Sequence, residues 1–351
     1  MDLIHPRTVA DVAEALRTAS QHGMRVLVVG GRRHLDKGNP AEVDAELWTT
    51  QLDQVVAYDP AEMLVVVQAG IRCGVLADLL ATHGQEWPAD APADATVGGV
   101  IASGSSSTRR MRVGALRDTV VEMELVTGDG RVVHSGARTV KNVTGYDVHR
   151  LATGSLGTLG VITQVALKVR PLPERRVTID AQGSVPLATA IARRVPLAAG
   201  VLATAETVEV RLEGWGTEVD ELEAEVAAVA PTTASPVDRA FPVHPWWAWP
   251  AGGTIVEAAV APSRLAEVVD GSSRFAALAG VGLAWIAASD ADELATIRTR
   301  VAAAGGIAPA IRGPGGLGGS APPGLDVHRR LRAAFDPAGI LAPGRGWHGP
   351  P

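Results

Sequence analysis

The chain has 351 residues, of which 46% are hydrophobic, and a formal net charge of −6, which suits a globular protein large enough for two domains. The acidic balance argues against a nucleic-acid partner, which selects a basic face, but it is compatible with a small anion held by local arginines or lysines. A single cysteine, Cys73, excludes an intrachain disulfide framework and an iron–sulfur cluster ligated by this chain alone.

Targeting signals are not visible in the sequence. The N-terminal residues lack a charged region followed by an apolar core, and no apolar run reaches membrane-spanning length. We therefore expect a cytoplasmic protein with no direct membrane span, which partners could still bring to a membrane.

The N-terminal part predicts a helix and then a buried strand. Residues 8–24 place their apolar side chains on one face, with Thr8 suited to the N-cap and Gly23 to the C-terminal end. Residues 25–29 follow as a short apolar strand.

Two glycines directly after this strand favour a backbone nest for phosphate. Gly30 and Gly31 begin the sequence GGRRHLDKG, in which Arg32, Arg33 and His34 would add positive charge. The pattern is not the usual dinucleotide fingerprint, because the third and sixth positions of GxGxxG are missing and no amphipathic helix follows directly. The alternative interpretation is a polar hairpin with a solvated charge run.

Residues 64–68 predict a strand and residues 73–83 a helix with a leucine-rich stripe. Cys73 stands at the start of that helix, where a helix dipole could lower the pKa of the thiol. We interpret it instead as a small packing residue, which is the commoner role.

A run of small residues comes next, after an extended Pro-containing loop. Such a run can wrap a flat or polyanionic ligand closely, because it offers backbone N–H groups and hydroxyls. We reject a low-complexity linker as the alternative, because VGGVIA is apolar and a predicted hairpin around 128–130 follows at once. The run contains Thr96, Gly98, Gly99, Ala102, Ser103 and Gly104.

The strongest signal lies in residues 138–170, RTVKNVTGYDVHRLATGSLGTLGVITQVALKVR. Gly154, Gly157 and Gly160 recur every third residue before an alternating strand, and glycine there lets the backbone approach a ligand because no Cβ intervenes. Residues 141–147 combine a cation, amides, a phenol and a carboxylate, a mixture typical of ligand-binding loops. The alternative is a glycine-rich turn that leads into a buried strand.

Three side chains in this stretch allow two interpretations each. His149 could act as a base, but on a segment flanked by apolar residues we interpret it as a packed or capping residue. Tyr146 fits either a cofactor contact or a hydrogen-bonded core tyrosine. Lys141 fits either neutralisation of a negative charge on a bound ligand, such as a phosphate, or a surface ion pair with Asp147.

The pattern changes after Leu172, where PLPERR marks a Pro-rich hinge. Beyond it, strands and helices alternate in two passes of a similar β-α-β-α order, which predicts an α+β module. The expected elements are 177–180, 187–194, 208–212, 218–228, 254–261, 263–279, 282–288 and 290–304.

Three further features belong to this second half. The tryptophans Trp246, Trp247 and Trp249 predict either an exposed partner patch or a core corner between the two domains. Residues 313–318, GPGGLG, match GxGxxG but are followed by prolines where a helix should start, so we interpret them as a flexible loop. Residues 327–335 predict a last helix.

Five motifs together resemble FAD-linked oxidases of the vanillyl-alcohol oxidase and PCMH superfamily, in the same order along the chain. They are VVGGRRHLDKG, TVGGVIASG, GALRDTV, KNVTGYDVHRLATGSLGTLGVIT and FDPAGILAPGR. The chain is most similar to the FAD-binding E-type subunit of bacterial glycolate oxidase. The resemblance covers nearly the whole first half and the extreme C-terminus.

The resemblance implies an α+β protein in three parts. They are a two-subdomain PCMH-type FAD-binding domain at 1–172, an α+β cap domain at 173–320, and a C-terminal segment at 321–351 that returns to the FAD domain. FAD would lie extended, with its pyrophosphate held by the backbone amides of residues 30–34. The implied cofactor-binding residues are Gly30, Gly31, Arg32, Arg33, His34, Thr96, Gly98, Gly99, Ser103, Gly104, Arg117, Asp118, Lys141, Tyr146, Gly157, Gly160 and Val161.

Two departures from the family pattern matter. Arg32 stands where the family usually has a third glycine, which predicts weaker or rearranged pyrophosphate binding. Arg33 stands where some relatives carry a flavin-linking histidine, with His34 one step along, so we expect non-covalent FAD.

The resemblance also suggests how the protein works. Catalytic relatives cluster histidines and acidic residues, often around a metal, whereas the nine histidines here are scattered, and Leu156 stands where the catalytic D-type relatives have glutamate. We therefore predict no metal site and assign no catalytic residue. The expected role is the FAD-binding subunit of a glycolate-oxidase-like complex, with a catalytic flavoprotein subunit, an iron–sulfur subunit and a small 2-hydroxy acid substrate. The alternatives are a self-sufficient 2-hydroxy-acid dehydrogenase or oxidase, and a non-catalytic scaffold with a degenerate flavin site, which Arg32 would favour.

Overall fold

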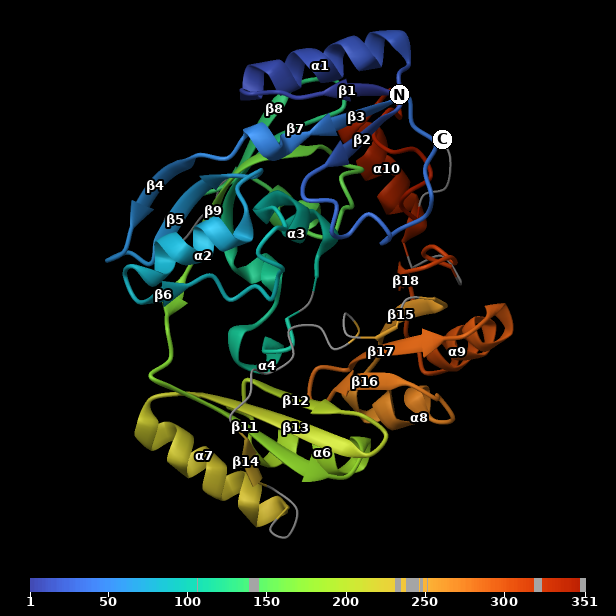
Figure 1. The fold of residues 1–351 in the computed structure, drawn as a ribbon. Helices are drawn as coiled ribbons and strands as arrows, with labels where there is room; N and C mark the ends of the chain where they lie inside the picture. The colour runs from blue at the N-terminus through green and yellow to red at the C-terminus, as the bar shows by residue number, and fades with distance from the viewer. Residues whose placement is uncertain are drawn as a thin grey trace. The chain divides into compact units, whose positions relative to one another are not determined.

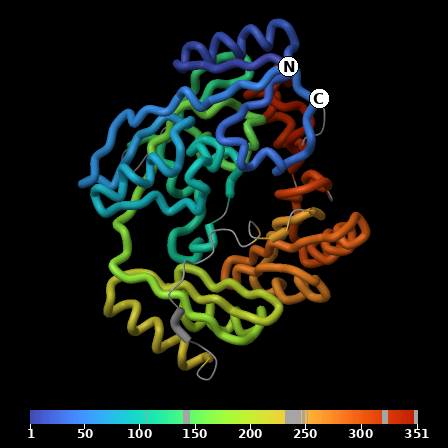
Figure 2. Tube along the Cα trace, in the orientation of Figure 1, coloured from blue at the N-terminus to red at the C-terminus, as the bar shows by residue number. Residues whose placement is uncertain are grey.

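The computed structural model describes residues 1–105, 107–138, 145–230, 235–237, 246, 249–250, 252–318 and 324–347. The chain forms two compact units (Figure 1, Figure 2). The first comprises Met1–Ser105, Ala115–Leu172 and Ala321–Pro351, and the second comprises Ser106–Gly114 and Pro173–Ser320. Both combine helices with sheets, which confirms the predicted α+β class.

A helix and a small parallel sheet open the first unit. Helix α1, Val9–His22, begins at Thr8, where Thr8 and Asp11 form a reciprocal capping box, and ends at Gly23 in the left-handed conformation. The sheet has the order β1-β3-β2, with β1 at Asp2–Ile4, β3 at Ala45–Trp48 and β2 at Val26–Val29. The helix predicted at 8–24 and the strand predicted at 25–29 are confirmed.

A five-stranded antiparallel sheet forms the other part of this unit, and α2 and α3 share a buried core with it. The strands, in sheet order, are β4 (Val55–Asp59), β5 (Leu64–Gln68), β9 (Val161–Lys168), β7 (Val120–Val126) and β8 (Val132–Gly136). The other elements are α2 (Cys73–Ala81), α3 (Val97–Ser103), α5 (Val148–Ala152), the turns η1 (Thr49–Gln51) and η2 (Leu116–Asp118), and the pair β6 (Gln85–Glu86) and β10 (Arg170–Pro171). The predicted hairpin is β7–β8, and the strand at 64–68 and helix at 73–83 are also confirmed.

The C-terminal segment packs on the small parallel sheet. After α10, Leu325–Phe335, the chain runs beside β2, where Val26 N donates to Ile340 O at 2.8 Å and Ala342 N donates to Val26 O at 2.8 Å. Buried Asp336 accepts from the backbone N–H groups of Ile340 and Leu341, which fixes the turn between the helix and this extended stretch.

The second unit is built on an eight-stranded antiparallel sheet. Its order is β14-β11-β13-β12-β16-β17-β15-β18. The strands are β11 (Arg175–Gln182), β12 (Gly200–Ala203), β13 (Thr207–Gly214), β14 (Ser235–Val237), β15 (Thr254–Ala259), β16 (Phe275–Leu278), β17 (Leu283–Ala288) and β18 (Ala310–Arg312). The helices are α4 (Arg110–Val113), α6 (Val185–Arg194), α7 (Gly216–Val229), α8 (Leu265–Val269), preceded by η4 (Pro262–Arg264), and α9 (Ala291–Ala303).

Helices α6, α7, α8 and α9 share one apolar core with a single face of this sheet. Each half of the sheet follows a β-α-β-β-α order, and β12 pairs with β16 where the halves meet. The predicted β-α-β-α order was wrong, because it omitted β12 and β16. The helix predicted at 263–279 was also wrong: Gly271, at φ 67°, follows the end of α8, and the buried sequence from Phe275 then forms β16.

The other face of the sheet carries a smaller core that contains Trp246, with Trp249 packed against it. Trp246 is only 8% exposed, so it does not belong to an exposed patch, and its core lies within the second unit. A corner between the two domains stays a prediction, and Trp247 lies outside the described residues. Residues 313–318 form neither helix nor strand.

The stretch Ser106–Gly114 clusters with the second unit although it interrupts the first in sequence. Arg112 on α4 donates to Glu218 Oε1 at 2.9 Å and to Leu197 O at 3.2 Å. The domain bounds at 172/173 and 320/321 stay a prediction. The stretch Ser106–Gly114 departs from it, because it lies within the predicted first domain but belongs to the second unit.

Candidate functional site

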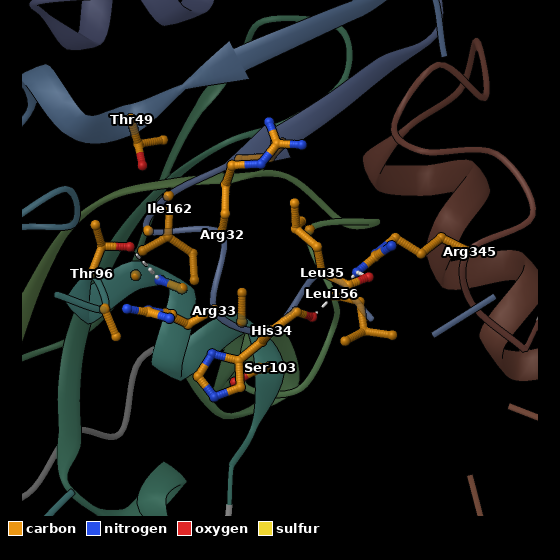
Figure 3. Close-up of a pocket in the computed structure, with 18 of the residues that line it drawn as sticks. Arg32, Arg33, His34, Leu35, Thr49, Thr96, Ser103, Leu156, Ile162 and Arg345 are labelled. Carbon is orange, nitrogen blue, oxygen red and sulfur yellow. Dashed lines mark hydrogen bonds between the residues drawn. The ribbon is translucent and has the colours of Figure 1, made fainter. Parts of the chain in front are cut away.

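A pocket in the first unit brings together segments that are far apart in the sequence (Figure 3). Its walls come from the end of β2 and the following loop, the N-terminal part of α3, the start of β9 and the C-terminal segment. It encloses ≈70 Å³, well below the ~300–1,000 Å³ of sites that enclose a whole small molecule, so an extended ligand would lie only partly inside it.

The glycines after β2 let the loop lie directly against the segment that precedes α3. A Cβ on Gly30 would stand 2.1 Å from Thr96 Oγ1, and a Cβ on Gly31 would stand 2.6 Å from Asp94 O. Neither distance is possible without a shift of the backbone or of Thr96. The absence of side chains at Gly30 and Gly31 therefore allows close packing within the protein, before any ligand is considered. The contact with Asp94 and Thr96 places the loop at the N-terminus of α3.

The N-terminus of α3 is already satisfied by protein acceptors. Thr96 Oγ1 accepts from Gly99 N at 3.2 Å, Gly98 N donates to Ala69 O at 2.7 Å, and Val97 N donates to Ile71 O at 3.0 Å. In contrast, the backbone N–H groups of Gly31, Arg32 and Arg33 have no acceptor among the residues that the structure describes. The loop, rather than the helix, therefore offers the free donors for an anion.

Arg32 occupies the position where a third glycine was expected. Its φ is 58°, in the left-handed region that glycine adopts readily. A backbone with one left-handed residue among free N–H groups is typical of an anion-binding nest. The loop therefore keeps the backbone geometry that a glycine would give, although the residue is arginine.

Arg33 is held by an ion pair at the rim of the pocket. Its Nε donates to Asp94 Oδ1 at 2.8 Å and a second guanidinium nitrogen contacts Asp94 Oδ2. The hydrogen bond from Arg33 holds the pKa of Asp94 below its usual range and raises the pKa of Arg33. Arg72 also donates to the Asp94 carbonyl, so this corner of the loop is fixed from two sides.

Arg345 closes the loop from the C-terminal segment. It is 7% exposed, and its guanidinium donates to Leu35 O at 2.8 Å, to Lys37 O at 2.7 Å and to His34 O at 3.5 Å. Burial lowers the pKa of Arg345, and nearby Asp36 opposes that shift. Sequence reasoning missed this residue, although the motif FDPAGILAPGR that contains it was a signal.

Comparisons with known proteins agree with this geometry. Residues 3–136 match the family model described as "FAD binding domain". That range contains β2, the glycine loop and α3.

Residues 3–136 of this chain therefore form an FAD-binding domain.

Curated relatives match between about a third and a half of the chain. "Glycolate oxidase subunit GlcE" of Escherichia coli is 36% identical over 128 residues, which are 36% of this chain and 37% of that protein. "Glycolate oxidase subunit GlcD" of Bacillus subtilis is 29% identical over 180 residues, 50% and 38% of the two chains. "D-2-hydroxyglutarate dehydrogenase, mitochondrial" of Bos taurus is 34% identical over 174 residues, 49% and 32% of the two. The matched stretch thus spans less than two-fifths of each of these relatives.

Among solved structures, an alkyldihydroxyacetonephosphate synthase has a similar fold. The TM-score is 0.72 with 16% identity, and the match covers 97% of this chain and 76% of that one. At this identity the likeness concerns the fold alone, and it extends to both units of the chain.

The first unit brings most of the predicted cofactor residues into the pocket. They are Gly30, Gly31, Arg32, Arg33, His34, Thr96, Gly98, Gly99, Ser103, Gly157 and Gly160. The other pocket-lining residues include Val28, Leu35, Thr49, Ala95, Ile162 and Arg345, which the sequence interpretation had not named. Leu156 also lines the pocket, at φ 56°.

Four other predicted cofactor residues, Gly104, Val161, Arg117 and Asp118, are not among the residues that line the pocket. Gly104 ends α3 at φ 61° and packs against Gly154, and Val161 is fully buried in β9. Arg117 and Asp118 lie in η2, where Asp118 pairs with Arg150 at 2.5 Å.

Two more predictions concern residues near 145. Tyr146 is 91% exposed, so the interpretation as a core tyrosine was wrong. Lys141 lies outside the described residues.

The first unit also contains two side chains that could have been reactive. His149 is buried, its Nδ1 lies 3.0 Å from Ser135 Oγ, and burial lowers its pKa. Cys73 is buried at the start of α2, and burial raises its pKa to about 12. Both are packing residues, as the sequence predicted.

Within the described ranges, no group of three or more His, Cys, Asp or Glu side chains is arranged to hold a metal ion. Over the same residues, none of the helices combines the length and apolar character that crossing a membrane requires.

Proposed function

We propose that this chain is an FAD-dependent oxidoreductase of 2-hydroxy acids that serves as the FAD-binding subunit of a glycolate-oxidase-like complex. The observation that supports it most strongly is the loop at the pocket inside the matched FAD-binding domain, where the backbone N–H groups of Gly31 to Arg33 have no acceptor among the described residues. Bound FAD would supply a ring that accepts a hydride from the substrate.

The described residues suggest how the domain would hold the cofactor. The N–H groups of Gly31 to Arg33 would donate to the pyrophosphate, and Arg345 would keep their loop in place through its carbonyl contacts. Gly99 lines the pocket without a side chain, and a Cβ there would stand 2.9 Å from Thr96 Oγ1, so a ligand would meet its backbone directly.

Non-covalent attachment fits the side chains around the loop. Arg33, at the position where some relatives link the flavin through histidine, is engaged with Asp94. The neighbouring His34 lines the pocket, and its backbone carbonyl is held by Arg345.

The subunit role is supported by the relative named glycolate oxidase subunit GlcE, which has the highest identity of those described above. The presence of Leu156 where D-type catalytic relatives have glutamate supports the same reading, since a leucine in the pocket wall supplies no proton-transfer group. The partners would be a catalytic flavoprotein subunit and an iron–sulfur subunit.

A self-sufficient dehydrogenase is the second candidate. It is supported by relatives named as dehydrogenases, such as the bovine D-2-hydroxyglutarate dehydrogenase and the D-lactate dehydrogenase of Archaeoglobus fulgidus, which is 30% identical over 170 residues.

Two measurements test the proposal. The absorbance spectrum of the purified chain should show flavin that acid releases into solution; a protein that stays colourless and binds no added FAD would contradict it and favour a scaffold. The chain should not reduce a dye with glycolate or D-lactate when alone, but should support dye reduction when co-expressed with candidate partner subunits. Turnover by the chain alone would favour the self-sufficient dehydrogenase.

A further inference from the structure

Arg32 has a backbone conformation that residues other than glycine avoid. Its φ of 58° lies in the left-handed region, where Cβ crowds the following carbonyl and disfavours an L-residue roughly tenfold or more. The residue lies in the loop that lines the FAD pocket, and Leu156, at φ 56°, lines the same pocket. Strain of this kind persists only where the surrounding structure enforces it.

The side chain of Arg32 supplies such an enforcement. One guanidinium nitrogen donates to both carboxylate oxygens of Glu46, at 2.9 and 3.2 Å, and the guanidinium lies 5.2 Å from the centre of the Trp48 ring. Trp48 Nε1 donates to Glu46 Oε2 at 2.9 Å. Figure 3 shows the Arg32 side chain on the opposite side of the loop from His34.

Glu46 is a strong anchor point because it is buried. Its side chain is 5% exposed on β3, whereas that of Arg32 is 49% exposed. A buried carboxylate without a cation is costly, so the fold itself draws the guanidinium towards Glu46. The strand β3 pairs with β2, which leads directly into the loop, so the anchor and the loop share one rigid support.

We propose that Glu46 and Trp48 are positioning residues that hold Arg32 in its left-handed conformation, and thereby hold the loop of residues 30–34 in the shape that binds the FAD pyrophosphate. In this arrangement Arg32 contributes its backbone N–H and not its charge, and a side-chain anchor replaces the conformational freedom of glycine. The inference deepens the proposed function and rests on FAD binding by this domain.

The consequence is measurable as FAD affinity. If the anchor is lost, the loop spends less time in the competent shape, and the apparent dissociation constant rises in proportion to the lost population. Because a left-handed arginine is disfavoured roughly tenfold, Glu46→Gln should weaken FAD binding by about tenfold.

Glycine at position 32 should remove this dependence. The double variant Arg32→Gly/Glu46→Gln should bind FAD within about twofold of the unmodified chain, because glycine adopts the left-handed region without an anchor. Arg32→Ala/Glu46→Gln should stay about tenfold weak, because alanine pays the same steric cost without a side chain to offset it. Titration of the apoprotein, followed by quenching of flavin fluorescence, measures all three.

A matched control keeps the test specific. Glu122→Gln removes the ion pair with Arg138 in the same unit, away from the pocket walls, and should leave FAD affinity within about twofold. Thermal unfolding of each apoprotein separates weaker binding from a damaged fold. Should Glu46→Gln fail to fold, Trp48→Phe removes the indole donor while keeping an aromatic ring, and should weaken FAD binding by about threefold.

Three outcomes would overturn the inference. The first is a Glu46→Gln variant that folds and binds FAD as tightly as the unmodified chain. The second is a glycine double variant as weak as the alanine double variant, because that result would assign the role to the arginine charge. The third is an equal loss of affinity in Glu122→Gln. If the unmodified chain binds no FAD, the proposed function fails instead, so the two failures are distinguishable.

Discussion

The pocket of the first unit and the eight-stranded sheet of the second unit differ in backbone conformation. The described non-glycine residues with positive φ are Arg32, Met63, Leu156 and Ala342, and all of them lie in the first unit. Two line the pocket, and Ala342 donates its N–H to β2, which leads into it. The described strands of the sheet, in contrast, contain no non-glycine residue with positive φ.

This difference shows which kind of contact stabilises each unit. The sheet gains stability from many apolar contacts, since even small strand residues such as Ala203 and Ala277 are fully buried in the core that it shares with the helices. The pocket depends on individual contacts, such as Glu46 with Arg32, that no neighbour can replace. A change in the sheet should therefore cost stability, whereas a change at the pocket should cost ligand binding.

The largest expected effect on stability comes from the buried charge of the sheet. Glu213 is fully buried on β13, and Arg109, Arg176 and Arg211 each approach it to 3.5 Å. Because breaking a buried ion pair leaves the partner charges uncompensated, Glu213→Gln should destabilise the second unit by about 3 kcal/mol. Hydrogen exchange of the β13 amides measures this, and FAD affinity should stay unchanged.

The exposed Glu206, in the turn between β12 and β13, provides the control for this change. Glu206→Gln should alter stability by less than ~0.5 kcal/mol. A large loss of FAD affinity in Glu213→Gln would break the comparison, because it would show that the sheet contributes directly to the cofactor site.

A smaller stability effect, with a large effect on binding, is expected at Gly30. The new Cβ of Gly30→Ala would stand 2.1 Å from Thr96 Oγ1, so the loop or Thr96 must shift, at a cost of about 2 kcal/mol. FAD affinity should fall at least about tenfold, because the shift displaces the loop donors. Calorimetry and FAD titration together check both numbers.

Gly216 offers a matched glycine in the second unit. A Cβ there would have no neighbour nearer than Glu174 at 4.0 Å, so Gly216→Ala should leave both stability and FAD affinity nearly unchanged. Removal of the Thr96 hydroxyl should partly restore the stability of Gly30→Ala. The double variant Gly30→Ala/Thr96→Ala should therefore lose less stability than the sum of the two single changes. Additive losses would contradict the contact between the loop and Thr96.

The same contrast explains what the sequence could predict. Helix α1 was predicted nearly to the residue because its signals are local: an apolar stripe, the Thr8 cap and Gly23. Strands β12 and β16 were missed because each is a four-residue apolar run buried on both faces, without the alternation that marks a strand.

At the pocket, the sequence predicted the glycines of the loop and of α3, since such runs have a recognisable composition. It could not predict that Glu46 would anchor Arg32 or that Arg345 would bind the carbonyls of residues 34–37. Both are long-range contacts set by tertiary packing, and neither leaves a pattern of spacing in the sequence.

A modest pH effect should appear in the first unit. Burial lowers the pKa of His149, so as the pH falls the unfolded chain binds a proton more readily than the folded one. The stability that neutral His149 provides is therefore present above pH ~6.5 and is lost as the pH falls through the lower folded pKa. His149→Gln should flatten this slope in thermal unfolding between pH 7 and 5, whereas the exposed His83→Gln should not.

The smallest effect concerns Cys73, whose reactivity reports on the wall of the pocket. Burial raises its pKa to about 12, which leaves little thiolate at pH 8, so iodoacetamide should modify the folded chain far more slowly than the unfolded one. Its backbone N–H donates to Ala95 O, and Ala95 lines the pocket, so opening of that segment should expose the thiol. Gly30→Ala, which displaces the adjoining contact at Thr96, should therefore accelerate alkylation, and Glu213→Gln should not. If Gly30→Ala and Glu213→Gln accelerated the alkylation of Cys73 equally, the pocket and the sheet would open together. The contrast between the two units would then fail.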